Sequence, residues 1–158
     1  MLAVGDVAPD FAIGGRSLYR MLEGGSVVLF FFPKAFTPIC TREASAFHRE
    51  HERLARAGFE VVGVSTDRQE TSDAFARSLG LRFPLVGDPQ QRVARSYKVR
   101  WPLIGLARRV TYVIDPSRRI RVAHHREFGA ESHVSAVCRQ AELAESYHRG
   151  ATFGRDTG

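Results

Sequence analysis

The sequence has few cysteines and no long hydrophobic stretch, and each shortage excludes a class of protein. Only two of its 158 residues are cysteines, Cys40 and Cys138, which is too few for a scaffold held together by disulfides. The longest apolar run, at residues 27–33, is far shorter than the ~20 residues of a membrane helix. No basic segment followed by an apolar one opens the chain, so no secretory signal is predicted. We therefore expect a cytoplasmic protein with reduced cysteines and no membrane contact.

Lysine is also scarce, although the chain is basic. The formal net charge is +6, and Lys34 and Lys98 are the two lysines among 23 basic residues. The arginines are spread along the whole chain, whereas a nucleic-acid-binding protein is expected to gather basic and aromatic residues on one face. We predict a solvated basic surface and no nucleic-acid partner.

Composition and length indicate one globular domain. Hydrophobic residues make up 44% and charged residues 25% of the chain, which is ordinary for a folded domain of this size. No internal repeat and no linker divides it. We predict a single domain over residues 1–149 and a flexible, polar, Gly-rich C-terminal tail over residues 150–158.

Hydrophobic patterning predicts strands that alternate with helices. A continuous apolar run at residues 26–32 is typical of a strand buried on both faces, and residues 59–65 are predicted to form a second buried strand. Further expected elements are helices over 38–57, 71–79, 89–97 and 131–147, a short edge segment over 83–86, and a hairpin of 110–114 with 120–125. The first half requires parallel strands with right-handed crossovers, and the second half adds an antiparallel pair. We predict an α/β, thioredoxin-like fold, in which a mixed central sheet has helices on both faces.

Cys40 lies where the first buried strand has ended and a helix begins. Pro38 fits the first turn of that helix, and sites in open α/β sheets form at the carboxyl ends of strands. Free backbone N–H groups and the helix dipole favour an anion there, and the thiolate is the nucleophilic form of cysteine. The position predicts a reactive cysteine, with a small buried hydrophobic residue as the ordinary alternative.

The residues around Cys40 resemble the active-site signature of the peroxiredoxin family, in the AhpC/TSA superfamily. The pattern is Pro33-x-x-x-Thr37-x-x-Cys40, and the string over residues 33–41 closely resembles the peroxiredoxin Q, or bacterioferritin comigratory protein, branch. Segments 5–11, 63–67 and 109–115 extend the similarity over most of the chain. The resemblance implies a thiol-dependent peroxidase that reduces hydrogen peroxide and organic hydroperoxides with no cofactor.

The resemblance also implies roles for five residues. Cys40 would be the peroxidatic cysteine, which attacks the O–O bond and becomes a sulfenic acid, and Pro33 would shield it from water. The hydroxyl of Thr37 would bond the thiolate or the peroxide. Arg109 would hold a guanidinium beside the sulfur, where charge develops as the O–O bond breaks. Glu43 would orient Arg109, although an exposed acid in the first helical turn is an alternative.

Arg108 is adjacent to Arg109 but should point to the opposite face of a strand, so Arg109 is the predicted site arginine. The turn after Asp115 and Pro116 lacks the glycine that relatives carry. Either the turn differs, or a non-Gly residue adopts the left-handed conformation there.

The sequence departs from the branch at the resolving cysteine. Many relatives have a second cysteine five residues after the first, where this chain has Ser45, which lies off the face of Cys40 on a helix. We predict a one-cysteine enzyme that is reduced by an external thiol, either thioredoxin, glutaredoxin or a low-molecular-weight thiol. The alternative is a two-cysteine mechanism in which Cys138, in an apolar stripe of the last helix, resolves Cys40.

Other functions are less compatible with the sequence. A disulfide oxidoreductase on this fold needs C-x-x-C, and Thr37 occupies the partner position. A non-catalytic binding or chaperone role is disfavoured by the joint presence of the signature residues. His48 and His51 have no acidic or cysteine partner at metal-ligand spacing, so no metal is predicted. The apolar loop 101–106 lines the peroxide entrance, contacts a second copy in a homodimer, or packs on its own core, and a monomer is equally compatible.

Overall fold

A five-stranded mixed sheet forms the centre of the computed structural model, which describes residues 1–127 and 129–153 of the chain. The strand order is β5-β4-β3-β6-β7. The strands are β3 (Ser26–Phe32), β4 (Phe59–Ser65), β5 (Leu85–Gly87), β6 (Val110–Ile114) and β7 (Ile120–His125). β3, β4 and β5 are parallel, whereas β6 runs antiparallel to β3 and to β7. The predicted parallel half and antiparallel hairpin are both present.

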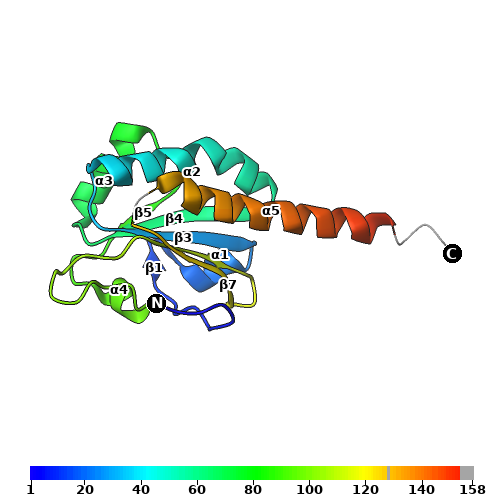
Figure 1. The fold of residues 1–158 in the computed structure, drawn as a ribbon, viewed down its shortest axis with the longest axis horizontal. Coiled ribbons are helices and arrows are strands. Elements are labelled where there is room, and N and C mark those ends of the chain that lie inside the picture. Colours follow the sequence, from blue (N-terminus) through cyan, green and yellow to red (C-terminus); the bar gives the residue numbers. More distant parts are fainter. Residues whose placement is uncertain (128, 154–158) are drawn as a thin grey trace.

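Helices cover both faces of this sheet, as predicted (Figure 1). One face carries the long helices α2 (Pro38–Arg56) and α5 (Ala130–Phe153) together with α3 (Gln69–Leu79). The opposite face carries the short helices α1 (Leu18–Leu22) and α4 (Arg92–Ser96). Within the described ranges, no helix is both long and apolar enough to cross a membrane.

The central strand β3 joins the two hydrophobic cores. Its even-numbered residues from Val28 to Phe32 pack under α2, α3 and α5, and its odd-numbered residues from Val27 to Phe31 pack against the other core. Phe30 stacks on Phe47 of α2 with 4.7 Å between ring centroids. Successive side chains of a strand point to opposite faces. A strand between two cores therefore has to be apolar on both faces, as β3 is.

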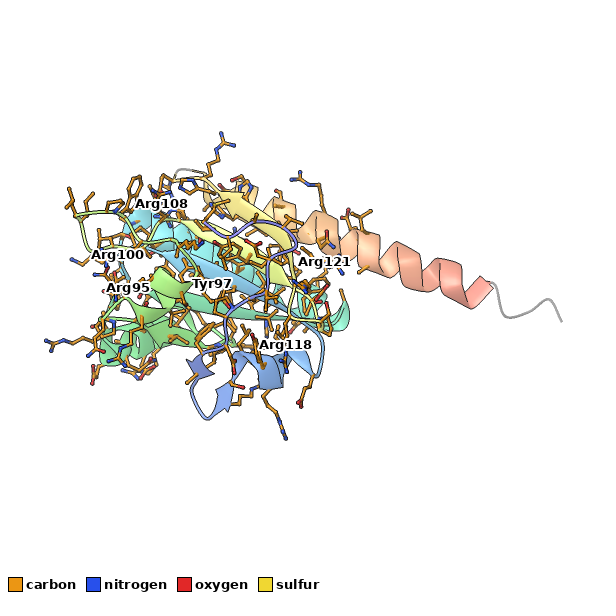
Figure 2. The ribbon with its side chains drawn as sticks, turned by 90° about the horizontal axis from the view of Figure 1, so that it is seen from below. Arg95, Tyr97, Arg100, Arg108, Arg118 and Arg121 are labelled. Carbon is orange, nitrogen blue, oxygen red and sulfur yellow. The ribbon has the colours of Figure 1, made fainter. Side chains whose placement is uncertain are left out.

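The segment before β3 contains elements that the sequence analysis did not predict. They are β1 (Ala12–Ile13), β2 (Arg16–Ser17) and α1. Two buried tyrosines hold this segment: Tyr97 donates its hydroxyl hydrogen bond to the carbonyl of Pro9, and Tyr112 accepts one from the backbone N–H of Leu2. Figure 2 shows Tyr97 in the interior of the molecule, and burial raises the pKa of Tyr112 to about 12.

In the turn between β6 and β7, which lacks the expected glycine, a non-Gly residue adopts the left-handed conformation. Arg118 adopts the left-handed conformation, with φ of 69°. The carboxylate of Asp115 accepts hydrogen bonds from the backbone N–H groups of Ser117 and Arg119, at 2.9 and 3.1 Å. The Arg118 guanidinium lies 4.0 Å from the centroid of the Tyr19 ring. These contacts offset the ~1–2 kcal/mol of backbone strain.

The last helix is longer than predicted. α5 continues past the expected end at Tyr147 to Phe153, so residues 150–153 are helical and do not belong to a tail. A single glycine inside a helix costs only about 1 kcal/mol relative to alanine, so Gly150 does not end it. The remainder of the predicted tail, residues 154–158, lies outside the described residues.

Candidate active site

The loop between β3 and α2 is fixed to the neighbouring strand. The backbone N–H of Ala35 donates to the Asp67 carboxylate at 2.7 Å, and the Thr66 hydroxyl donates to the carbonyl of Pro33 at 3.0 Å. Both partners follow the end of β4. Cys40 lies in the first turn of α2 and is only 1% exposed. The structure therefore places the predicted cysteine at the carboxyl edge of the two central strands.

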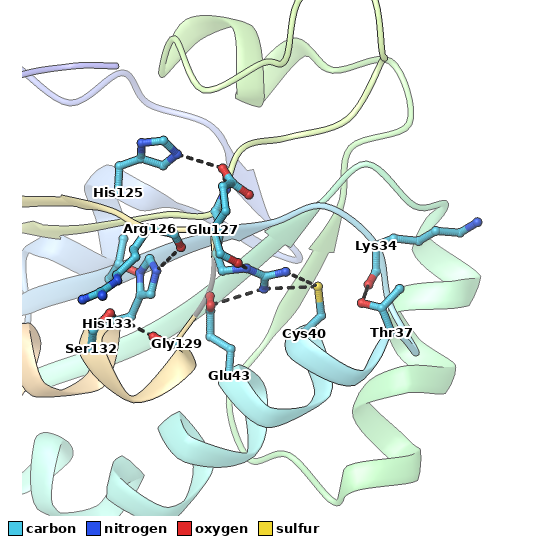
Figure 3. Close-up of polar contacts among 12 residues, drawn as sticks. Lys34, Thr37, Cys40, Glu43, His125, Arg126, Glu127, Gly129, Ser132 and His133 are labelled. Atoms are coloured by element: carbon cyan, nitrogen blue, oxygen red, sulfur yellow. Dashed lines mark hydrogen bonds and ion pairs between the residues drawn. The ribbon is translucent and has the colours of Figure 1, made fainter.

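Arg109 brings its guanidinium directly to the sulfur of Cys40. Its Nη1 and Nη2 atoms each donate to Cys40 Sγ at 3.3 Å, and Nη1 also donates to Glu43 Oε2 at 3.3 Å (Figure 3). Burial opposes the charged form, but Cys40 and Glu43 raise the pKa of Arg109 above its ordinary value. Arg108 instead lies over the ring of Trp101 at 4.9 Å. Of the two adjacent arginines, Arg109 is therefore the one that contacts the sulfur.

Glu43 is fully buried and belongs to this group. Its exposed fraction is zero, so the alternative of an exposed first-turn acid is wrong. Burial raises the pKa of Glu43 to about 7, although the charge and hydrogen bond of Arg109 act in the opposite direction. The second carboxyl oxygen, Oε1, is buried without a hydrogen-bond partner in the described structure.

Glu127 is a site residue that sequence analysis missed. Arg109 donates through Nε to the backbone carbonyl of Glu127 at 3.0 Å and through its own backbone N–H to Glu127 Oε1 at 3.3 Å. The same Oε1 lies 2.8 Å from Nε2 of His125. The bond from Arg109 Nε goes to the main-chain carbonyl of Glu127, which any residue type would supply. No sequence signal could therefore have identified Glu127.

His133 of α5 fixes the segment that carries Glu127. Its Nδ1 lies 2.8 Å from the Thr111 hydroxyl, and its Nε2 lies 2.8 Å from the carbonyl of Arg126. Burial lowers the pKa of His133 to about 4, so the ring is neutral near pH 7. The backbone N–H of Arg126 in turn donates to the carbonyl of Arg109 at 3.3 Å. The arginine is thus held from its backbone as well as from its side chain.

Thr37 caps α2 but does not bond the sulfur. Its backbone is extended (φ −81°, ψ 151°), and its hydroxyl donates to the carbonyl of Lys34 at 2.8 Å. The hydroxyl proton is therefore used within the loop, which leaves the oxygen as an acceptor. The predicted bond from Thr37 to the thiolate is absent from the described structure.

A mainly apolar pocket of about 450 Å³ is bordered by Arg109 and by the residues that precede Cys40. Its lining comprises Pro33, Lys34, Thr37, Pro38, Ile39, Leu106 and Arg109. Leu106 belongs to the apolar loop 101–106, so this part of the loop forms a wall of the site. Leu103 and Ile104, at the tip of the same loop, are exposed.

Cys138 is on α5 and lies near Glu50 and Arg53 of α2, whereas Cys40 is in the first turn of α2. Cys138 is half-buried on α5, where burial and Glu50 raise the pKa of its thiol and Arg53 lowers it. One turn further along α5, Glu142 pairs with Arg53 at 2.8 Å. Across the part of the chain that the structure describes, no group of three or more His, Cys, Asp or Glu residues is arranged to hold a metal ion.

Comparison with known proteins agrees with this fold. The AhpC/TSA family matches residues 4–123. The chloroplastic peroxiredoxin Q of Sedum lineare is 37% identical over 135 residues, which are 82% of this chain and 73% of that protein. The chloroplastic peroxiredoxin Q of Gentiana triflora is 33% identical over 145 residues, 89% of this chain and 67% of that protein.

Solved structures confirm the predicted thioredoxin-like arrangement. Peroxidoxin BcpB from Mycobacterium tuberculosis matches with a TM-score of 0.81 at 33% identity, covering 91% of this chain and 96% of that one. Peroxiredoxin Q from Xanthomonas campestris matches with a TM-score of 0.69 at 28% identity, covering 76% and 79%. The chain therefore belongs to the AhpC/TSA family, as a peroxiredoxin of the peroxiredoxin Q branch with the activity of a thiol-dependent peroxidase.

Proposed function

We propose that Cys40 is the peroxidatic cysteine of this enzyme. Its thiolate sulfur bonds to the terminal oxygen of a hydroperoxide, the O–O bond breaks, and the electron pair leaves with the other oxygen. That oxygen takes up a proton and departs as an alcohol, or as water from hydrogen peroxide, and Cys40 becomes a sulfenic acid. The observation that carries this proposal is the pair of Arg109 N–H groups, each 3.3 Å from Cys40 Sγ.

The other residues act on this reaction by position. The Arg109 guanidinium stabilises the thiolate and the charge that develops on the departing oxygen, because fixed donors aimed at developing charge are a large catalytic contribution. Glu43 and Glu127 hold that guanidinium in place. Thr37 accepts a hydrogen bond from the bound hydroperoxide, since its own proton is donated to the Lys34 carbonyl. Pro33 forms part of the pocket wall and excludes water from the sulfur.

The apolar wall of the pocket supports organic hydroperoxides as substrates beside hydrogen peroxide. Ile39 and Leu106 line the pocket that Arg109 borders, and an alkyl group buried against them is favoured by about 0.8 kcal/mol per CH₂. A similar structure, the bacterioferritin comigratory protein of Xanthomonas campestris, is described for alkyl peroxide reduction activity.

Two loop variants test this substrate class. Leu106→Ser should lower kcat/KM for an aryl or alkyl hydroperoxide by about tenfold and should leave hydrogen peroxide within about twofold. Leu103→Ser, on the exposed tip of the same loop, is the matched control and should change neither value. Equal losses for both peroxides in the Leu106 variant would show that the wall does not select the substrate.

For the second half of the cycle we propose a one-cysteine mechanism with an external thiol. Cys138 lies opposite Glu50 and Arg53, and a position ten residues along α2 from Cys40 is about 15 Å away at 1.5 Å per residue. Disulfides need Cα atoms within about 7 Å. The sulfenic acid is therefore reduced from outside by thioredoxin, glutaredoxin or a low-molecular-weight thiol.

Mass spectrometry of the intact protein after one equivalent of peroxide tests both proposals. A single added oxygen on Cys40, trapped by dimedone, is expected, and Cys40→Ser should abolish turnover while remaining folded. Cys138→Ser should turn over at the wild-type rate with a small thiol. A Cys40–Cys138 disulfide, within one chain or between two, would establish the two-cysteine alternative.

A further inference from the structure

The group at the active site contains one buried cation and two buried acids. Arg109 Nη1 lies 3.3 Å from both Cys40 Sγ and Glu43 Oε2. Exposed fractions are 1% for Cys40, 0% for Glu43 and 4% for Arg109. Cys40 and Glu43 are three residues apart on α2, so they lie on one face of the helix and reach the same guanidinium. All three side chains therefore share one environment with little access to water.

The electrostatics of this group favour a single negative charge. Two anions beside one cation would leave an uncompensated negative charge in a buried site, which is strongly unfavourable. The remaining neighbours do not compensate this negative charge, because Glu127 adds further negative charge to the surroundings of Glu43. His133, which α5 presents to this region, is kept neutral by burial. Glu43 Oε1 has no hydrogen-bond partner in the described structure, which is costly for a carboxylate but much less so for a neutral carboxyl group.

We propose that Glu43 holds the proton that Cys40 gives up and supplies it to the oxygen that leaves. This inference rests on the proposed role of Cys40. In the resting enzyme the sulfur is the anion and Glu43 is a neutral carboxylic acid. The sulfur then takes the OH oxygen of the hydroperoxide, the alkoxide leaves, and the Glu43 proton converts it to the alcohol. The products are a neutral sulfenic acid, a Glu43 carboxylate and ROH, with every proton and charge accounted for.

The charge beside Arg109 thus moves from sulfur to carboxylate during the reaction. The guanidinium has one anionic partner before the step and one after it, so the buried site never carries two anions or none. The raised pKa of Glu43, about 7, is consistent with a group that holds a proton in one state and releases it in the other. General acid groups work best when their pKa is close to the working pH.

Counting protons during a single turnover tests this directly. The protein is mixed with one equivalent of hydroperoxide and an indicator dye in a weak buffer at about pH 8, above the pKa of about 7 of the carboxyl group, so that the carboxylate formed does not take a proton back from solution. Before the reaction, the like charge of the Cys40 thiolate keeps Glu43 protonated at this pH. Wild-type protein should take up almost no proton from solution per Cys40 oxidised, because Glu43 supplies it. Glu43→Gln has no proton to give and should take up one proton per Cys40.

Infrared difference spectra of the wild-type protein provide a second measurement that needs no variant at Glu43. The oxidised-minus-reduced spectrum should lose the C=O band of a protonated carboxylic acid and gain carboxylate bands. Cys40→Ser should show no such change on addition of peroxide. These spectra decide the question even if the Glu43→Gln protein does not fold.

The outcomes separate the two proposals. If the wild-type protein takes up one proton per oxidised Cys40 and shows no loss of the carboxylic acid band, Glu43 is ionised throughout and this inference is wrong. If mass spectrometry finds no oxygen added to Cys40, the proposed role of Cys40 fails instead.

Discussion

Replacing Arg109 tests the contact on which the proposed chemistry depends most. The alanine variant removes both N–H donors to Cys40 Sγ and the ion pair with Glu43. Arg109→Lys keeps a positive charge but loses the planar fork that reaches the sulfur with two groups. Arg108→Ala is the matched control, because Arg108 is the neighbouring arginine and lies over the ring of Trp101 instead of beside the sulfur.

The expected magnitude follows from the number of donors lost. Removing one preorganised donor to developing negative charge costs about 10²–10³ in rate, or roughly 3–4 kcal/mol of barrier. Arg109→Ala removes two donors that share one side chain, so oxidation of Cys40 by hydrogen peroxide should slow by at least about 100-fold. Arg109→Lys should lose about tenfold or more, because one ammonium cannot replace the bidentate contact. Arg108→Ala should stay within about twofold of wild type.

Stopped-flow measurement of the second-order rate constant for Cys40 oxidation provides the assay. Circular dichroism melts must accompany it, because Arg109→Ala leaves the buried carboxyl of Glu43 without its partner. The argument is refuted if folded Arg109→Ala retains the wild-type rate constant, or if Arg108→Ala shows the loss in its place.

Three further predictions concern buried groups and the missing cysteine. The pKa of Glu43 is about 7 in the folded protein, so its contribution to stability, up to about 3 kcal/mol, is complete below its ordinary pKa and is lost as pH rises through 7. In urea unfolding, Glu43→Gln should remove this declining contribution, so the free energy of unfolding of the variant relative to wild type should rise between about pH 4.5 and 7. The pKa of His133 is about 4, so its contribution is complete above about pH 6.5 and is lost as pH falls toward 4. His133→Gln should remove this acid loss, and since the two slopes oppose each other, the wild-type curve should be nearly flat. Ser45→Cys should form a disulfide with Cys40 under peroxide only if α2 unwinds, so mass spectrometry should find it more often in mild urea than in buffer.

The parts of the fold that could be predicted from the sequence are those with a clear pattern of hydrophobic residues. β3 is apolar from Val27 to Phe32, and β4 is largely apolar, because each separates two cores. β1 and β2 were missed because two-residue strands carry no period at all. α1 does have Leu18, Met21 and Leu22 at helical spacing and all buried, and the capping serine Ser17 before them is a signal that could have been used.

The site divides in the same way. The spacing of Cys40 and Glu43 on a helix is local geometry that sequence contains. The predicted alternation of Arg108 and Arg109 along a strand is wrong, because both residues lie just before β6. They nevertheless have different contacts, with Trp101 for Arg108 and with Cys40 for Arg109. The contact of Arg109 with the Glu127 carbonyl depends on how the chain returns after β7, and the hydroxyl of Thr37 is directed by a loop carbonyl. Such contacts depend on tertiary structure and cannot be derived from residue types.

The burial of Cys40 has a consequence for the timing of the catalytic cycle. A hydroperoxide is small enough to enter the pocket of about 450 Å³ that Arg109 borders, but a protein thiol is attached to a backbone that is too bulky to enter it. Under the proposed mechanism, in which Cys40 is oxidised and then reduced from outside, a protein reductant must wait until the first turn of α2 opens and presents the sulfenic acid. At high reductant concentration the opening rate then sets turnover, so the oxidised enzyme has a fixed minimum lifetime that further protein thiol does not shorten. A small thiol that fits the pocket escapes this limit, and its rate continues to rise with its concentration.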